Sequence, residues 1–142
     1  MMAWVTDSPD ENNLRETSLK YRFHSAMMYP LGFSLDLNNL TNEEIEEIKM
    51  YISKYKEIRH TVQDGDLYRL LSPRSPYGCA VQYVKKDRSQ SALFVFRHKQ
   101  QFREPFYPVI LKGLDRDGIY YSKELDIKCS GASLMTRGVQ LN

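Results

Sequence analysis

Hydrophobic residues recur with helical spacing in the middle of the chain. The apolar or aromatic side chains at steps of three and four residues are Ile45, Ile48, Ile52, Tyr55, Ile58 and Val62. This spacing places them on one face of a helix. Thr41 and Glu44 have the spacing of a capping box, and Gly65 is a typical residue just beyond a helix end. The pattern therefore predicts one long helix between Thr41 and Gly65.

The pattern changes to a period of two directly after Gly65. Leu67 and Arg69 would point to one side of a strand, and Tyr68 and Leu70 to the other. Further short apolar runs follow between turn residues, at Cys79–Val84, Ala92–Phe96, Val109–Leu111 and Ile119–Tyr121. The first two of these runs predict a hairpin, and all of them together predict an antiparallel β-sandwich. The alternation of Val139 and Leu141 predicts an edge strand at the end.

The N-terminal part predicts one strand and one helix. Met1–Val5 is an apolar run suited to a strand buried on both faces of a parallel sheet. We expect its neighbours to lie outside this chain, because no strand–helix unit is evident after it. A polar loop, Thr6–Glu16, leads to a helix from Thr17 or Ser18 to about Met28. Its apolar stripe consists of Leu19, Phe23, Met27 and Ala26.

This chain of 142 residues has two parts with different hydrophobic patterns. The change of period at Gly65 divides it into a helical part, residues 1–64, and a β part, residues 65–142. The helical faces, with Ile48, Ile52 and Phe23 among them, would need a sheet that this chain does not contain. We therefore expect exposed apolar helix faces and a chain that is incomplete at both ends.

Composition and charge exclude some classes of partner. Hydrophobic residues make up 42%, charged residues 27%, and the net charge is +2, which is ordinary for a soluble globular protein. We expect no nucleic-acid or membrane partner and a cytoplasmic location, since no apolar span or targeting segment is evident. Cys79 and Cys129 lack metal-ligand spacing. They are interpreted as buried free thiols, with a disulfide as the alternative.

The titratable residues indicate no metal site and no cofactor. His24 is expected to be a packed or surface side chain, and His60 and His98 lie too far along the chain to join it as metal ligands. The basic runs Lys85–Arg88 and Arg97–Lys99 are interpreted as solvated loop charges rather than a nucleic-acid patch.

The order of several short motifs resembles the C-terminal part of glycoside hydrolase family 36, whose members include bacterial α-galactosidases. These motifs are M-M-A-W-V-T-D-S-P (Met1–Pro9), L-K-Y-R-F-H-S-A-M-M (Leu19–Met28), Y-K-E-I-R (Tyr55–Arg59), V-Q-D-G-D-L-Y-R-L-L-S-P (Val62–Pro73) and S-G-A-S-L-M-T-R-G (Ser130–Gly138). Each motif is weak alone, but they occur in the family's order and cover nearly the whole chain.

The resemblance implies a place for each part in a larger fold. That fold has a (β/α)8 barrel followed by a C-terminal antiparallel β-sandwich. Met1–Val5 resembles the eighth barrel strand, and Thr17–Asp64 resembles the helices that close the barrel. Residues 65–142 resemble the sandwich domain. The expected fold class is thus α+β, with the end of a barrel and an incomplete sandwich.

The resemblance also implies a retaining α-galactosidase that removes terminal α-linked galactose with two aspartates. The family's K-W-D-like and S-D-x-x-D-A-like motifs do not occur here, so no catalytic residue is assigned and the chain alone is expected to be inactive. Cys129–Ala132 echoes a C-S-G-G sugar-site turn but lies in the sandwich part. Pro9-Asp10 stands where the family often has Pro-Asn. The full-length protein is expected to be a homo-oligomer that binds α-galactosides.

Trp4 and Asp7 are the candidate substrate-binding residues. Asp7 directly follows a parallel strand, where the active sites of barrels lie, and together with Asp10 it invites an acid/base interpretation. Trp4 would be either a sugar-stacking platform or a core residue. The alternative function is a free-standing carbohydrate-binding or protein-interaction module. It would require aromatic residues on one exposed face, namely Tyr68, Tyr77, Tyr83 and Tyr107.

Overall fold

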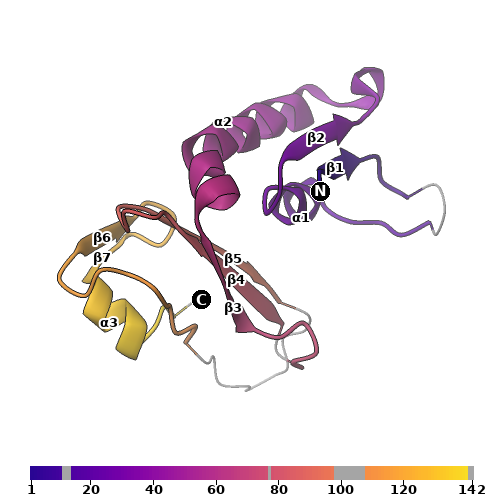
Figure 1. Cartoon of the computed structure of the whole chain (residues 1–142). Helices are drawn as coiled ribbons and strands as arrows, with labels where there is room; N and C mark the ends of the chain where they lie inside the picture. Colours follow the sequence, from indigo (N-terminus) through magenta and orange to yellow (C-terminus); the bar gives the residue numbers. More distant parts are fainter. Residues whose placement is uncertain (11–13, 77, 98–107, 141–142) are drawn as a thin grey trace. The chain divides into compact units, whose positions relative to one another are not determined.

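The computed structural model describes residues 1–10, 14–76, 78–97 and 108–140. The chain forms two compact units, unit 1 (Met1–Gln63) and unit 2 (Asp64–Asn142) (Figure 1). The elements up to the end of the long helix are β1 (Ala3–Thr6), α1 (Leu19–Ala26), β2 (Leu31–Ser34), the 3₁₀ helix η1 (Leu37–Asn39) and α2 (Asn42–Asp64). Unit 2 continues with β3 (Asp66–Leu71), β4 (Cys79–Val84), β5 (Ser91–Phe96), β6 (Ile119–Ser122), β7 (Ile127–Ser130) and α3 (Gly131–Thr136).

Unit 1 contains a parallel pair of strands. β1 pairs with β2 in a register that runs from Ala3 opposite Leu31 to Thr6 opposite Ser34. The parallel pairing is confirmed from Ala3 onward, but the strand is not buried on both faces, because Trp4 and Thr6 are exposed. The expectation that no strand–helix unit follows it is also wrong. β1, α1 and β2 form such a unit, so Met1–Val5 is not the last parallel strand, contrary to what the resemblance implies. The hydrophobic pattern does not reveal β2, because this strand has only four residues and one of them is Gly32.

Both helices begin where the capping residues predict. The Ser18 Oγ accepts a hydrogen bond from the Tyr21 backbone N–H at 3.2 Å. Thr41 and Glu44 form the predicted capping box, with the Glu44 N–H donating to Thr41 Oγ1 at 3.2 Å and the Thr41 N–H to Glu44 Oε2 at 2.9 Å. Each cap satisfies backbone groups that a helix terminus leaves unpaired. α2 ends at Asp64, one residue before Gly65, also as predicted.

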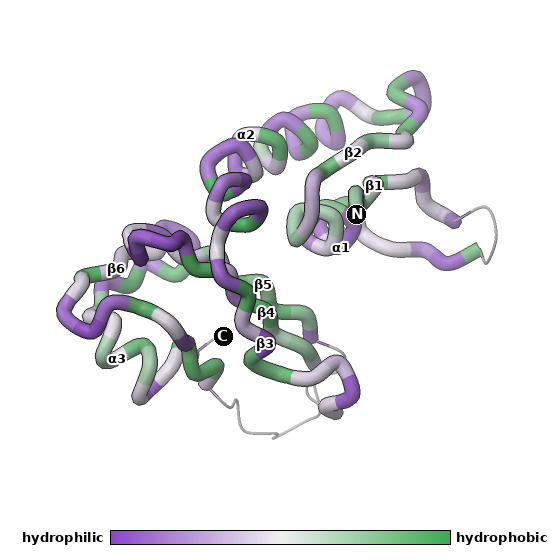
Figure 2. The backbone as a smooth tube through the Cα atoms, in the orientation of Figure 1, coloured by the Kyte–Doolittle hydropathy of each residue, from purple (hydrophilic) through white to green (hydrophobic). Residues whose placement is uncertain are grey.

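The apolar faces of the two helices are buried, which corrects the expectation that they stay exposed. The buried set includes Leu19, Phe23, Met27, Ile48 and Tyr55, whereas Ile52 is half-buried. Phe23 stacks on Tyr51 with ring centroids 4.9 Å apart and lies 5.5 Å from the Phe33 ring of β2. Tyr51 and Thr61 are also buried on α2, although the sequence pattern did not include them. In Figure 2 the tube of α2 alternates between hydrophobic and hydrophilic stretches, as a half-buried helix does.

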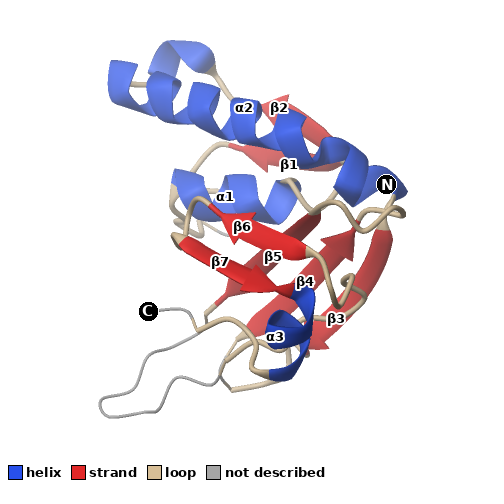
Figure 3. Ribbon diagram, turned by 90° about the vertical axis from the view of Figure 1, so that its left-hand side faces the viewer, coloured by secondary structure: helices blue, strands red, loops and turns tan. Residues whose placement is uncertain are grey.

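Unit 2 consists of two antiparallel layers. The order β3-β4-β5 makes one sheet and β6-β7 the other, and the predicted hairpin pairs Cys79 with Phe96 through Val84 with Ser91. Figure 3 shows β6, β7 and α3 in front of the three-stranded sheet. Their shared core consists of Val84, Leu111, Leu114, Leu134 and Val139, with Tyr68, Leu70, Leu93, Tyr120 and Ile127 among the side chains packed on it. Tyr68 and Leu70 therefore share the inward face of β3, which the alternation alone did not specify.

Two expectations near the end of the chain are wrong. Val109–Leu111 is not a strand, because its one β-bridge is the isolated pairing of Val109 with Val139, while the Leu111 N–H donates to the Leu134 carbonyl at 3.2 Å. The chain between β7 and Val139 forms the helix α3, which the pattern missed, and Ser130 caps it by accepting from the Ser133 N–H at 3.2 Å. The predicted edge strand is thus reduced to one bridge at Val139, and Leu141 lies outside the described residues.

Candidate functional site

The two faces of the β1–β2 sheet differ in their cover. Val5 is fully buried, and its register partner Phe33 packs on the α1 residue Phe23, so this face is turned to the helices. Figures 1 and 3 both show α1 and α2 on the same side of the two strands. Side chains alternate along a strand, so Trp4 and Thr6 lie on the opposite face. No described element of unit 1 covers that face.

Trp4 lies on the backbone of the neighbouring strand. Its register partner is Gly32, and a Cβ added to Gly32 would come within 2.7 Å of the Trp4 Cε3 atom. Only glycine leaves room for the ring in this position. The indole remains 57% exposed, so Trp4 presents a flat apolar surface rather than filling a core of this unit.

The carboxyl ends of β1 and β2 carry a cluster of polar groups. Thr6 and Ser34 are register partners, and both are exposed. The next residue, Asp7, accepts a hydrogen bond from the Asp36 backbone N–H through its Oδ1 atom at 3.3 Å. The Asp36 carboxylate in turn accepts from the Asn38 N–H at 3.0 Å and begins η1. Asp7 and Asp36 therefore tie together the two loops that leave the strands.

Arg22 on α1 fixes the end of β1 from the other side. Its Nη1 donates to the carbonyl oxygen of Thr6. The Nε of the same side chain is buried and has no hydrogen-bond partner among the described residues. A cation on the last strand carbonyl holds the backbone just before Asp7.

This edge can hold a polar ligand. Ligands of parallel α/β folds bind outside the carboxyl ends of the strands, and here hydroxyl and carboxylate groups meet a flat aromatic ring. The structure brings the predicted residues Trp4 and Asp7 to this same edge. Sequence reasoning missed Thr6, Ser34 and Asp36, and recognising β2 as a strand would have found the last two. Asp10 lies further along the loop, where its carbonyl accepts from the Leu14 N–H at 2.8 Å.

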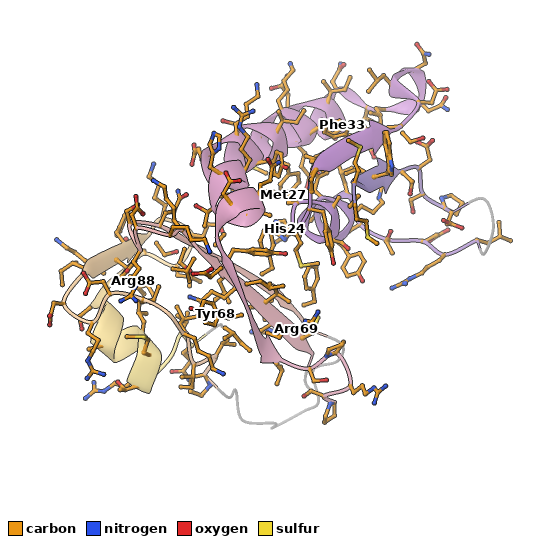
Figure 4. The ribbon with its side chains drawn as sticks, in the orientation of Figure 1. His24, Met27, Phe33, Tyr68, Arg69 and Arg88 are labelled. Carbon is orange, nitrogen blue, oxygen red and sulfur yellow. The ribbon has the colours of Figure 1, made fainter. Side chains whose placement is uncertain are left out.

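The histidines and cysteines form no second site in the described part of the chain. His24 lies edge-on to Tyr51, with ring centroids 5.4 Å apart, in line with a packed histidine. Figure 4 labels the His24 side chain on α1. His98 is outside the described residues. Among the residues described, no group of His, Cys, Asp or Glu side chains could hold a metal ion. Cys79 and Cys129 are unpaired, but both are half-buried rather than buried as expected, and the partial burial raises the pKa of the Cys79 thiol.

The basic loop of unit 2 carries its own acidic partners. Lys85 Nζ lies 3.2 Å from Asp87 Oδ2, and Lys86 pairs with Asp66. Lys85, Lys86 and Asp87 are solvent-exposed in the turn between β4 and β5, and Asp66 is exposed at the start of β3. No helix in the described ranges is both long and apolar enough to cross a membrane.

The tyrosines of unit 2 do not form one exposed aromatic face. Tyr68 is the register partner of Gln82, whereas Tyr83 pairs with Leu67, so the two tyrosines point to opposite sides of the sheet. Tyr83 is only 7% exposed and lies edge-on to Phe94. Tyr77 and Tyr107 lie outside the described residues. This arrangement disfavours the free-standing carbohydrate-binding module.

Comparisons with known proteins match both parts of the chain. The family described as melibiase matches residues 1–65, and the glycosyl hydrolase family 36 C-terminal domain matches residues 78–142. α-Galactosidase AgaA from Geobacillus stearothermophilus is 37% identical over 141 residues, which are 99% of this chain and 19% of that protein. α-Galactosidase Mel36A from Lactobacillus acidophilus is 33% identical over 138 residues, 97% of this chain and 19% of that protein.

Solved structures agree with these relatives in fold. A crystal structure of AgaA from Geobacillus stearothermophilus superposes with a TM-score of 0.93 at 37% identity, covering all of this chain and 20% of that one. The galactosidase domain of the α-galactosidase–sucrose kinase AgaSK gives a TM-score of 0.91 at 28% identity, over 99% of this chain and 20% of that domain. The chain thus spans about a fifth of the length of the proteins it matches.

Proposed function

We propose that this chain, which belongs to glycosyl hydrolase family 36, works as the C-terminal part of a retaining α-galactosidase. In this role the whole protein hydrolyses terminal α-linked galactose from oligosaccharides. The observation that carries the proposal is the similarity of 99% of the chain to one continuous segment of α-galactosidase AgaA. The chain contributes to the fold around the active site and does not supply the catalytic carboxylates.

The two parts of the chain have different roles in this proposal. Residues 1–64 form the end of the catalytic barrel, and the alternation of β1, α1, β2 and α2 with parallel strands supports this role. Residues 65–142 form a C-terminal β-sandwich domain, which the antiparallel sheets and the separate core of unit 2 support. A parallel sheet is normally covered on both faces. The uncovered face with Trp4 is therefore the interior side of the barrel in this arrangement.

Trp4 and Asp7 are the proposed substrate contacts. The exposed indole of Trp4 can stack on the apolar face of a sugar ring, and Asp7 can accept a hydrogen bond from a sugar hydroxyl through Oδ2. Asp7 Oδ1 already holds the Asp36 N–H, so this carboxylate is positioned before a substrate arrives. Neither residue is proposed as nucleophile or acid/base.

We also propose a cytoplasmic homo-oligomer without nucleic-acid or membrane partners. The unpaired Cys79 and Cys129 suit a reducing compartment. The pairing of Lys85 and Lys86 with carboxylates leaves no basic patch in that loop for nucleic acid. The exposed side chains of Ile119 and Tyr121, which alternate along β6, support contact with another subunit.

A hybrid enzyme tests the proposed function. The matched segment of AgaA is replaced by this chain, and the purified hybrid is assayed with an activated aryl α-galactoside. The hybrid is expected to hydrolyse the α-galactoside but not the matched β-galactoside, whereas the chain alone is expected to be inactive. A folded hybrid without turnover, or turnover by the isolated chain, would contradict the proposal.

A further inference from the structure

We propose that Thr6 and Ser34 form a hydroxyl pair that binds the sugar hydroxyls of the galactosyl group. This inference rests on the proposed function and adds two binding residues to it. The ligand class is a pyranoside, because two neutral hydroxyl side chains can bind sugar hydroxyls through hydrogen bonds alone.

The register of the two parallel strands sets the pair. Thr6 is directly opposite Ser34, each as the last residue of its strand. Neighbouring strands lie about 4.8 Å apart, so both hydroxyl groups can reach one sugar ring. Both residues are exposed and share the face of Trp4, because each lies two residues beyond Trp4 or its partner Gly32. The hydroxyl pair is therefore nearer to the carboxyl edge of the sheet than the indole ring.

The strand ends are fixed before a ligand binds. Arg22 holds the carbonyl oxygen of Thr6, and Asp7 holds the N–H of Asp36 two residues after Ser34. Thr6 is β-branched, which restricts its χ1 angle. A site whose groups are already held in place loses less conformational entropy on binding.

The chemistry of the pair suits a sugar. Each hydroxyl can donate one hydrogen bond and accept others, and a sugar hydroxyl has the same capacity. The indole of Trp4 lies one step deeper and offers an apolar surface below the hydroxyls. Together they present polar groups to the edge of a sugar ring and an aromatic face to its C–H groups.

The hybrid enzyme with AgaA separates this inference from the proposed function. Thr6→Val and Ser34→Ala each remove a hydroxyl with little change of volume, and the double variant is expected to raise KM at least tenfold with a smaller change in kcat. Thr6→Ser keeps the hydroxyl and is expected to restore KM. Ser53→Ala, on the exposed surface of α2, is the matched control and is expected to leave KM unchanged. An active hybrid whose KM does not respond to the double variant would overturn the hydroxyl pair but leave the proposed function intact.

A titration of the chain itself provides a second test that needs no activity. Galactose is added to the isotopically labelled chain at a concentration at which sedimentation shows the monomer, and the backbone amide shifts are followed by NMR. Shifts are expected at Thr6 and Ser34 but not at Ser53, and they are expected to vanish in the double variant. Amide shifts that are absent from this edge, or that persist without the two hydroxyls, would also overturn the inference.

Discussion

Asp87 shows how one exposed turn controls the charge of a carboxyl group. The side-chain hydroxyl of Ser89 donates to Asp87 Oδ1 at 2.6 Å, and the Ser89 backbone N–H donates to the same oxygen at 2.9 Å. Hydrogen bonds from Ser89, followed by the contribution of Lys85, lower the pKa of Asp87 from 3.8 to about 2. All of these donors favour the ionised carboxylate.

The pH dependence of the turn follows from this lowered pKa. The folded state favours ionised Asp87, so its contribution to stability is present above pH 3.8 and is lost as the pH falls through about 2. NMR titration of the Asp87 carboxyl carbon is expected to give a midpoint near 2. In Ser89→Ala, which loses the hydroxyl donor, the midpoint is expected to rise towards 3.8. Equal midpoints in both proteins would show that the serine hydroxyl does not set the pKa.

Residues that act on their own sequence neighbours could be predicted from the sequence, whereas contacts across strands could not. Thr41 and Glu44 satisfy each other's backbone groups within one turn, so their spacing was enough to predict the start of α2. Trp4 and Asp7 were predicted as candidate site residues from their place beside a strand. Thr6 and Ser34 were missed because their pairing depends on the register of two strands that α1 separates.

At the scale of elements, a buried glutamine joins β4 to the segment before β6. Gln82 is fully buried, and its amide donates to the carbonyl oxygen of Lys112 at 3.0 Å while accepting from the Lys112 N–H at 2.8 Å. It also donates to Ser91 Oγ at 3.0 Å. The side chain thus makes the two hydrogen bonds that a neighbouring strand would make, next to the buried Leu111 and Leu114.

Loss of this amide is expected to destabilise unit 2. Gln82→Leu has a similar volume but leaves the Lys112 N–H and carbonyl without their side-chain partner. An unsatisfied backbone group costs about 1–3 kcal/mol, so the free energy of unfolding measured in urea is expected to fall by about that amount. Gln140→Leu, at an exposed position, is the control and is expected to change it little. If Gln82→Leu leaves the free energy of unfolding unchanged, water replaces the amide without cost.

Elements with a strong local pattern were predicted, and short elements held by distant contacts were not. α2 and the β4–β5 hairpin have long periodic patterns and clear turn residues. β2 has four residues with a glycine, and α3 has six residues whose burial depends on the core around Leu134. Val109 is a residue type that is common in strands, but it forms a single bridge, with Val139. Its secondary structure therefore depends on the surrounding chain and not on its own propensity.

At the scale of the whole molecule, the two units differ in how far they cover their own sheets. Unit 2 has antiparallel sheets with a core between them, in which Leu111 and Leu134 are buried. Unit 1 covers one face of β1–β2 with helices and leaves the Trp4 face open. The change of hydrophobic period at Gly65 predicted two parts from the sequence. It could not predict which face of the parallel strands stays open, because that depends on where α1 and α2 pack.

The open face of unit 1 is expected to make the isolated chain self-associate. Met1, Met2 and Trp4 are 102%, 51% and 57% exposed, and no other described strand pairs with the second edge of β1. A large apolar side chain left in water forgoes about 1.5–3 kcal/mol of burial, and an unpaired strand edge can take up a strand from another chain. Sedimentation over a concentration series is expected to show reversible association, weakened in Trp4→Lys. Met50→Lys removes an apolar side chain of 44% exposure from α2 instead, and is expected to leave the association unchanged. If the chain stays monomeric at all concentrations, or if both variants weaken the association equally, the β1–β2 face is not the contact surface.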